Sequence, residues 1–434
     1  MIHLNGALLR QVSTALPRTP VLRGESTVRP LMRALTLAFV LSLFLFRPAA
    51  LGQNFVPVGL ITVAVLFGVY TLGCIPKGQK ALVRDLLILG LLVCVYLTYE
   101  AGIAILFSYS NLDFVLKQIV TVLVILVCYA TFLADRRNNE LFFRHFTNVV
   151  SLLGWSSAIT VAAALFVHLD HLTLFHFSMK GYEGRGVLVE TGTVYFPLSM
   201  GYGTYAGSGI TLMRLTGFFR EPGIYQAIAA FCLVVASVTS RSWFIRLGLV
   251  VGIIFTFSTA GIAMLVFAIG ATYFLKSRLA FVKILVLGTV LLTCVYATLY
   301  VPVVGLLDKK ETHGTSITER TTAILEGMRR VADNPLGTGL YSAEPTSKRT
   351  DIGLLAAIGS LGVIGFLLQV ILLSGVRGSM DASTRQRLIA CTPVLLTALF
   401  SQPIAGEAML YVLVMWSAPK RVASEQPAEI SRSV

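Results

Sequence analysis

The sequence is poor in charged side chains. Of its 434 residues only 13% are charged, whereas 56% are apolar; a soluble globular domain carries about 25% charged residues. So little polar surface cannot cover a water-soluble particle of this size. Long apolar segments separated by short charged ones are typical of a chain that crosses a membrane several times.

Cysteine, histidine and nucleotide-binding motifs are also scarce. The six cysteines all fall inside apolar segments and form no CxxC pair, which argues against a disulfide framework. The six histidines show no metal-ligand spacing with cysteines or paired acids. Neither GxxxxGK[ST] nor GxGxxG in a strand–helix setting occurs. We therefore expect no metal, no cofactor and no nucleotide.

Basic residues outnumber acidic ones, which gives a net charge of +14. They do not gather into one patch that could follow a phosphate backbone; they punctuate the apolar segments. This pattern is typical of residues that set membrane topology. We expect membrane lipid, and no nucleic acid, as the partner of this charge.

The distribution of apolar segments predicts an all-α polytopic membrane protein with about twelve transmembrane helices. The expected regions are a basic cytoplasmic tail at 1–33, helices 1–5 at 34–168, a first long periplasmic loop at 169–221, helices 6–9 at 222–302, a second long loop at 303–351, helices 10–12 at 352–418 and a cytoplasmic tail at 419–434. The first span resembles a signal peptide, but we expect it to stay uncleaved. The short apolar pairs around Ser258 and Pro403 are either hairpins or broken helices.

The orientation follows from the basic residues in short connections. With both termini inside, the cytoplasmic connections and the N-terminal tail hold most of the 35 Lys and Arg residues, including Arg377, Arg385 and Arg387. The short outer connections hold only Arg47 and Lys117. This asymmetry obeys the positive-inside rule. Both long loops then lie outside the cytoplasm.

Glu100 and Lys117 are charges within apolar segments, and such charges are costly in lipid. They stand at similar distances from the turn at 109–110, so an antiparallel hairpin would place them at similar depth. We favour a structural ion pair between two helices over a functional site.

The stretch at 214–226 has the densest chemistry in the first loop. Pro222 suits the first position of the next helix, with Glu221 near the N-cap. The exposed N–H groups of that helix start and the guanidinium of Arg220 together predict an anion site at the membrane surface. Glu221 is either a plain helix cap or a carboxylate beside that anion.

The second loop contains a capping-box pattern at 316–319 that opens a helix ending before Asn334-Pro335. An apolar stripe is expected on one face, with three charged residues on the far side. The stripe comprises Ile317, Ile324, Met328 and Val331, and the far side Glu319, Glu326 and Arg330. Arg320 flanks the stripe, so it either turns toward the bundle or snorkels at the interface.

These motifs and the layout together resemble the O-antigen polymerase and O-antigen ligase family of bacterial surface-polysaccharide enzymes. The resemblance rests on 214–223, on Arg320 in a long penultimate outer loop, on the Asn-Pro-Leu-Gly segment at 334–340 and on the glycine-rich re-entry at 352–365. It spans most of the chain by layout and a few short stretches by motif.

Membership would imply a metal-independent glycosyltransferase of the glycosyltransferase-C type in the bacterial inner membrane. Its substrate would be an oligosaccharide on undecaprenyl pyrophosphate, and a sugar hydroxyl would displace the lipid pyrophosphate at the outer face. Arginine suits such a leaving group because its fork pairs with phosphate and keeps its charge. The resemblance carries over Arg220 and Arg320 as pyrophosphate clamps, Arg214 as a third, and Glu221 as base or orienting group. We add Tyr225 and Glu319 as candidate substrate contacts.

One departure distinguishes the members of that family. Its ligases carry a histidine just before re-entry, and the stretch at 341–351 has none. This favours a repeat-unit polymerase of O-antigen or exopolysaccharide, working beside a flippase and a chain-length regulator, over a ligase acting on lipid A core. A flippase or transporter would be expected to show two repeated halves and a large central cytoplasmic loop, and neither is visible. A non-catalytic scaffold would give the arginines no role.

Overall fold

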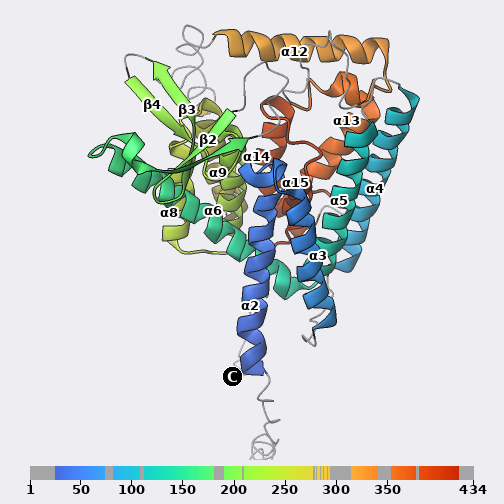
Figure 1. The fold of residues 1–434 in the computed structure, drawn as a ribbon. Coiled ribbons are helices and arrows are strands. Elements are labelled where there is room, and N and C mark those ends of the chain that lie inside the picture. The colour runs from blue at the N-terminus through green and yellow to red at the C-terminus, as the bar shows by residue number, and fades with distance from the viewer. Residues whose placement is uncertain are drawn as a thin grey trace, which may run out of the picture.

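The computed structural model describes residues 25–73, 82–107, 112–179, 190–207, 210–276, most of 279–293, 314–339, 353–377 and 381–419. This part of the chain is mostly helical (Figure 1). The helices are α2 (Glu25–Ser42), α3 (Val56–Leu72), α4 (Val83–Leu106), α5 (Leu112–Leu133), α6 (Arg136–Ala164), α7 (Pro222–Val238), α8 (Trp243–Ile254), α9 (Thr259–Lys276), α12 (Gly314–Asp333), α13 (Ile358–Ser374), α14 (Ala382–Phe400) and α15 (Ala408–Val414). Short 3-10 turns lie at Leu43–Leu45, Ala50–Gln53 and Leu169–Leu172.

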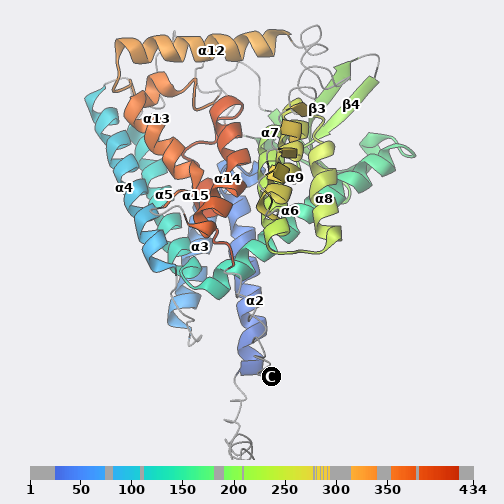
Figure 2. The ribbon, with the colours of Figure 1, turned by 180° about the vertical axis from the view of Figure 1, so that it is seen from behind.

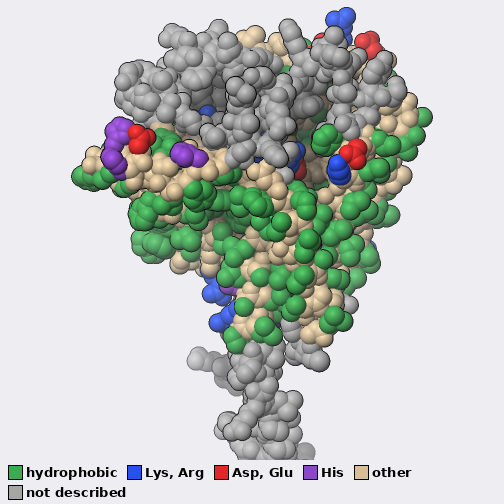
Figure 3. All heavy atoms as spheres, viewed as in Figure 1, with side chains coloured by type: hydrophobic (Ala, Val, Ile, Leu, Met, Phe, Trp, Pro, Cys, Tyr) green, Lys and Arg blue, Asp and Glu red, His purple; other side chains and the backbone are tan. Residues whose placement is uncertain are grey.

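Three of the described helices, α4, α5 and α6, are long and apolar enough to cross a membrane. Several others, among them α3, α7, α8 and α13, are apolar but shorter. Large apolar side chains are exposed on the outside of α4, such as Leu87 at 67% and Ile105 at 72%. Hydrophobic side chains cover much of the middle of the surface in Figure 3. The described chain is therefore built as a helical membrane protein, while the twelve spans and their orientation stay a prediction.

Helix α7 forms the centre of the fold. Every residue from Pro222 to Ser237 is buried, and α7 packs against α6, α8, α9 and α14. The close packing rests on small residues, because Gly154 of α6 and Gly252 of α8 both face the Tyr225 side chain of α7. Since α7 begins at the end of the first loop, this packing fixes the loop's last residues in place.

The first long loop is not irregular. It contains a four-stranded antiparallel sheet in the order β1 (Thr173–Met179), β2 (Glu190–Tyr195), β3 (Ser199–Gly207) and β4 (Ile210–Leu215). The expectation of an all-α protein is therefore wrong for this region. Its strands are short and rich in Thr, Tyr and Phe among glycines, residues that fit a pleated surface. Both views place the sheet and α12 at one end of the helical body, with α2 beginning at the other (Figures 1 and 2).

Several helix boundaries differ from the predicted ones. Helix α2 begins at Glu25, so the last residues of the predicted tail are helical. Helix α6 begins at Arg136, well before the apolar run, because the Asp135 side chain accepts hydrogen bonds from the N–H groups of Arg137 and Asn138. Of the two short pairs, α8 and α9 pack against each other as a hairpin, whereas α14 and α15 are separated by residues 401–407, here called the C-terminal break.

The predicted ion pair between Glu100 and Lys117 is wrong. Lys117 Nζ lies 2.6 Å from Asp113 Oδ2, and both side chains are about 70% exposed. Glu100 is 4% exposed and lies in a polar cluster with Tyr96 and Tyr411. Glu100 faces the interior of the bundle, whereas Lys117 stands on the exposed side of α5.

Two arginines of one predicted cytoplasmic connection, Arg377 and Arg387, also have a structural role. Arg387 is fully buried, and its guanidinium donates to the carbonyls of Trp416 (2.8 Å) and Gly375 (3.3 Å) and to Asp85 Oδ2 (3.2 Å). Arg377 is also buried and donates to the carbonyl of Val414. These side chains tie the end of α15 to α4 and α13.

Candidate functional site

The motif at 214–223 links β4 to the central helix α7, and its backbone is closely constrained. The Thr216 N–H donates to the Met200 carbonyl (2.9 Å), and the Met200 N–H donates to the Gly217 carbonyl (3.0 Å). Gly217 has φ +59°, and a Cβ built there would lie 3.0 Å from the buried Tyr225 ring. Glycine is required on both counts. The motif thus holds the two residues after Phe219 in a defined position.

Arg220 is positioned by a distant part of the chain. Residues 46–50 run antiparallel to 218–220, with Ala49 and Phe219 as bridge partners. The Ala50 N–H donates to the Phe218 carbonyl (3.0 Å), and the Arg220 N–H donates to the Pro48 carbonyl (3.3 Å). This pairing brings Arg47 and Arg220 to the same place.

Glu407 completes this cluster from the C-terminal end of the chain. It is the last residue of the C-terminal break, and its Oε1 lies 3.8 Å from Arg47 Nη1. Both Arg47 and Arg220 interact electrostatically with its carboxylate. Arg47 and Glu407 were not predicted as site residues. Their signals were present: Arg47 is an exception to the positive-inside pattern, and Glu407 is a charge inside an apolar segment.

The predictions around the start of α7 have mixed outcomes. Pro222 is the first residue of α7 and Glu221 occupies the N-cap position, as predicted, but the Glu221 side chain makes no capping hydrogen bond. Arg214 is half-buried, and its Nε donates to the Thr256 carbonyl (3.3 Å) between α8 and α9. Tyr225 is fully buried, and its hydroxyl donates to the Val150 carbonyl (3.3 Å). Tyr225 is therefore a core residue here, and we leave it out of the site.

Helix α12 ends at Asp333, as predicted, and lies across the end of the bundle (Figure 1). The face of α12 that packs against the bundle differs from the predicted apolar stripe. Ala323 and Gly327 are buried, whereas Met328 of that stripe is 42% exposed. Gly327 packs on the backbone of Ala356, so close contact between small residues selects the face. Arg330, expected on the far side, packs against Gly359 of α13.

Arg320 is half-buried and turns toward the bundle. It lines a narrow crevice between α12 and the ends of α13 and α14. The crevice residues are Arg320, Ile324, Gly353, Ala356, Leu399 and Phe400. The side chain of Glu319 lies outside the described residues. The segment before α13 is fixed by hydrogen bonds from the N–H groups of Leu354 and Leu355 to the carbonyls of Ala398 and Leu399.

One stretch of chain connects both arginine sites. Phe400, at the end of α14, lines the crevice of Arg320. Gln402 packs against Gly223 in the first turn of α7, and Glu407 lies beside Arg220. The end of α14 and the C-terminal break that follows it therefore run from the surroundings of one arginine to the other. Two guanidinium groups and the N-terminus of α7, set along one segment, form an arrangement that suits a polyanionic ligand.

The chain matches no family model, no curated protein and no solved structure. The family resemblance in the motifs therefore remains a prediction, and the geometry of the site carries the functional argument.

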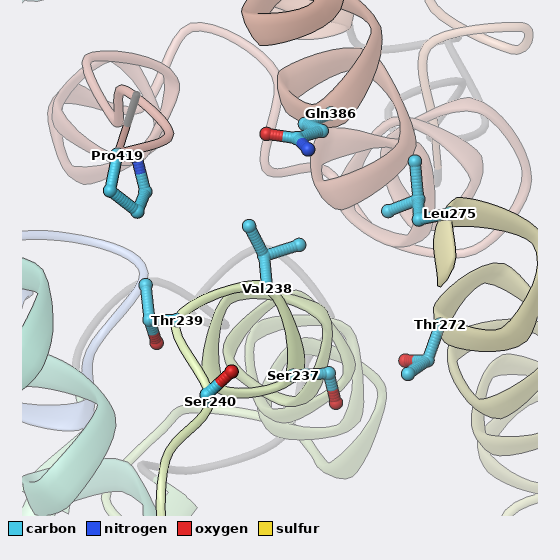
Figure 4. Close-up of a pocket in the computed structure, with 8 residues that line it drawn as sticks. All are labelled: Ser237, Val238, Thr239, Ser240, Thr272, Leu275, Gln386 and Pro419. Atoms are coloured by element: carbon cyan, nitrogen blue, oxygen red, sulfur yellow. The ribbon is translucent and has the colours of Figure 1, made fainter. Parts of the chain in front are cut away.

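A separate cavity lies away from the arginines. It has a volume of about 210 Å³ and is bounded by the C-terminal ends of α7 and α9, by α14 and by Pro419 (Figure 4). Its lining residues are Ser237, Val238, Thr239, Ser240, Thr272, Leu275, Gln386 and Pro419. None of these carries a charge, so the cavity offers no permanent positive charge to a pyrophosphate, and we place the candidate site at the arginines.

Proposed function

We propose that this protein is a polysaccharide polymerase that transfers a glycan from undecaprenyl pyrophosphate to a sugar hydroxyl of another lipid-linked repeat unit. In this proposal it resides in the bacterial inner membrane with both termini in the cytoplasm. The sheet and α12 face the periplasm. The observation that carries the proposal is the course of the chain from Phe400, which lines the Arg320 crevice at the end of α14, through the C-terminal break to Glu407 beside Arg220.

The proposed chemistry needs stabilisation of a leaving pyrophosphate more than protonation of it. Arg220, at the start of α7, and Arg320, on α12, supply permanent positive charges, and the N–H groups of the α7 terminus add partial ones. Both arginines are half-buried, so solvent screens their charges less than those of exposed side chains. Developing negative charge on the pyrophosphate would be stabilised by these preorganised groups. Glu221 and Arg214 would act in orienting the sugar and the loop.

Alanine substitutions of the two arginines test the proposal. A strain lacking the gene would be complemented with Arg220→Ala, Arg320→Ala or the matched control Arg329→Ala, an exposed arginine on the same helix as Arg320. Loss of one such charge typically costs about 10²-fold or more in turnover. We expect the first two variants to lose long glycan chains and accumulate single lipid-linked repeats. The control should keep the wild-type distribution of glycan chain lengths, seen as a ladder of bands on a gel. Membrane-fraction levels of each variant show that insertion is intact.

The glycan pattern of the deletion strain separates the alternatives. Single-repeat products support the polymerase. Unattached full-length polymers would indicate a ligase, and absence of lipid-linked repeats from the outer face would indicate a flippase. Normal ladders from both arginine variants would remove the catalytic assignment altogether.

A further inference from the structure

The C-terminal break delivers a carboxylate to the arginines. Gly406 has φ +83°, which turns the chain, and Glu407 then takes the N-cap position of α15. Its side chain makes no capping hydrogen bond and instead faces Arg47 at 3.8 Å, where it stays 22% exposed. A carboxylate that does not cap its own helix and remains partly accessible can meet a ligand.

Glu407 is surrounded by charged and neutral polar groups from several segments. The guanidinium groups of Arg47, from the connection before α3, and Arg220, from the start of α7, both interact with its carboxylate. Tyr411 of α15 interacts electrostatically with both Glu407 and the buried Glu100. Neutral hydrogen bonds hold Tyr411 and the backbone next to Glu407 in place. Gln369 Nε2 donates to the Tyr411 hydroxyl (2.9 Å), and Gln118 Nε2 donates to the Gly406 carbonyl (3.3 Å).

From this geometry we infer that Glu407 is the general base of the transfer, an inference that rests on the proposed function. The acceptor hydroxyl oxygen forms the new bond to the anomeric carbon, the bond from that carbon to the pyrophosphate oxygen breaks, and the hydroxyl proton passes to a Glu407 carboxylate oxygen. The lipid pyrophosphate leaves with the bonding electron pair. Atoms and charge balance without a further reactant.

The two arginines give this base a dependence on the donor. Positive neighbours favour the ionised form of a carboxylate, so Arg47 and Arg220 make Glu407 a weaker base than it would be without them. A pyrophosphate bound between Arg47 and Arg220 competes for those groups. Glu407 then loses part of its positive environment and becomes a stronger base when the donor is in place. Glu221, on the same segment as Arg220, is the competing candidate, and the experiment must separate the two.

The test uses the full-length protein in liposomes, supplied with the lipid-linked single repeats extracted from the deletion strain. Elongation is measured as kcat and donor KM across pH for wild type, Glu407→Gln, Glu407→Asp, Glu221→Gln and the control Glu140→Gln, a partly exposed glutamate paired with Arg136. We expect Glu407→Gln to lower kcat by about 10²-fold or more, with KM nearly unchanged and the acidic limb of the pH profile lost. Glu407→Asp should recover part of the rate and restore that limb with a shifted midpoint.

Each outcome decides one point. Absence of elongation by the wild type would overturn the proposed function itself. If the wild type is active, two results would overturn only the inference about Glu407. One is an unaltered kcat and acidic limb in Glu407→Gln; the other is a loss of kcat that occurs only in Glu221→Gln. If Glu407→Gln does not fold, Glu407→Asp decides: an unchanged kcat and an unshifted limb in that variant would refute the role.

Discussion

Gly217 offers a direct test of how the loop motif is built, through the substitution Gly217→Ala. The residue has φ +59°, and an alanine held in the left-handed region costs about 1–2 kcal/mol. Its Cβ would lie 3.0 Å from two atoms of the Tyr225 ring, and that ring is fully buried. Such overpacking costs a further 1–3 kcal/mol or so. We expect the free energy of unfolding to fall by roughly 2–5 kcal/mol in total.

The assay is reversible unfolding of the purified full-length protein in mixed detergent–SDS micelles, followed by circular dichroism. Gly68→Ala is the matched control, because no heavy atom lies within 4 Å of its added Cβ and alanine is favoured over glycine inside a helix by about 1 kcal/mol. The control should therefore be as stable as the wild type or more so. An equal unfolding midpoint for both variants would show that the 214–223 turn does not have the described geometry.

Other predictions concern charged residues away from the site. Arg387→Leu should destabilise the protein by about 3–5 kcal/mol in the same assay, since it leaves buried acceptors without their donor. Substitution of the exposed Arg385 by Leu should change stability little, and equal losses of stability in the two variants would contradict this. Lys117→Met should cost less than about 0.5 kcal/mol because both members of its ion pair are exposed, and a loss as large as that of Arg387 would show a buried role. The backbone and side-chain hydrogen bonds of Thr384 lower the pKa of Asp381. Its contribution to stability should hold above the ordinary carboxyl pKa and fade as pH drops below it; unfolding midpoints of Asp381→Asn should lack that dependence.

Features that depend on a few neighbouring residues were predicted well. The start of α7 at Pro222 and the end of α12 at Asp333 both follow from local rules about proline. Helices α4 and α5 lie inside the region 34–168 predicted to hold helices 1–5, because length and hydropathy can be evaluated along one segment. Arg320 turned toward the bundle, one of the two outcomes that helix geometry allowed.

Features that depend on docking were missed or mistaken. The strands at 173–215 are short, and they are stabilised by pairing with one another, which the sequence of a single strand does not indicate. The face of α12 that meets the bundle follows Gly327 rather than the apolar stripe. Glu100 and Lys117 were matched by depth, but hairpin depth does not determine which face a side chain occupies.

The sequence by itself determined that this chain is a helical membrane protein and that arginines stand beside the helix start at Pro222. Those properties follow from composition and from spacing along the chain. Only the tertiary structure brought Arg47, Arg220 and Glu407 together, from positions near the two ends and the middle of the chain. The physical reason is that residues 46–50 pair with 218–220 and the C-terminal break packs on α7. Contacts between segments so distant in sequence leave no periodicity or motif that one segment alone could show.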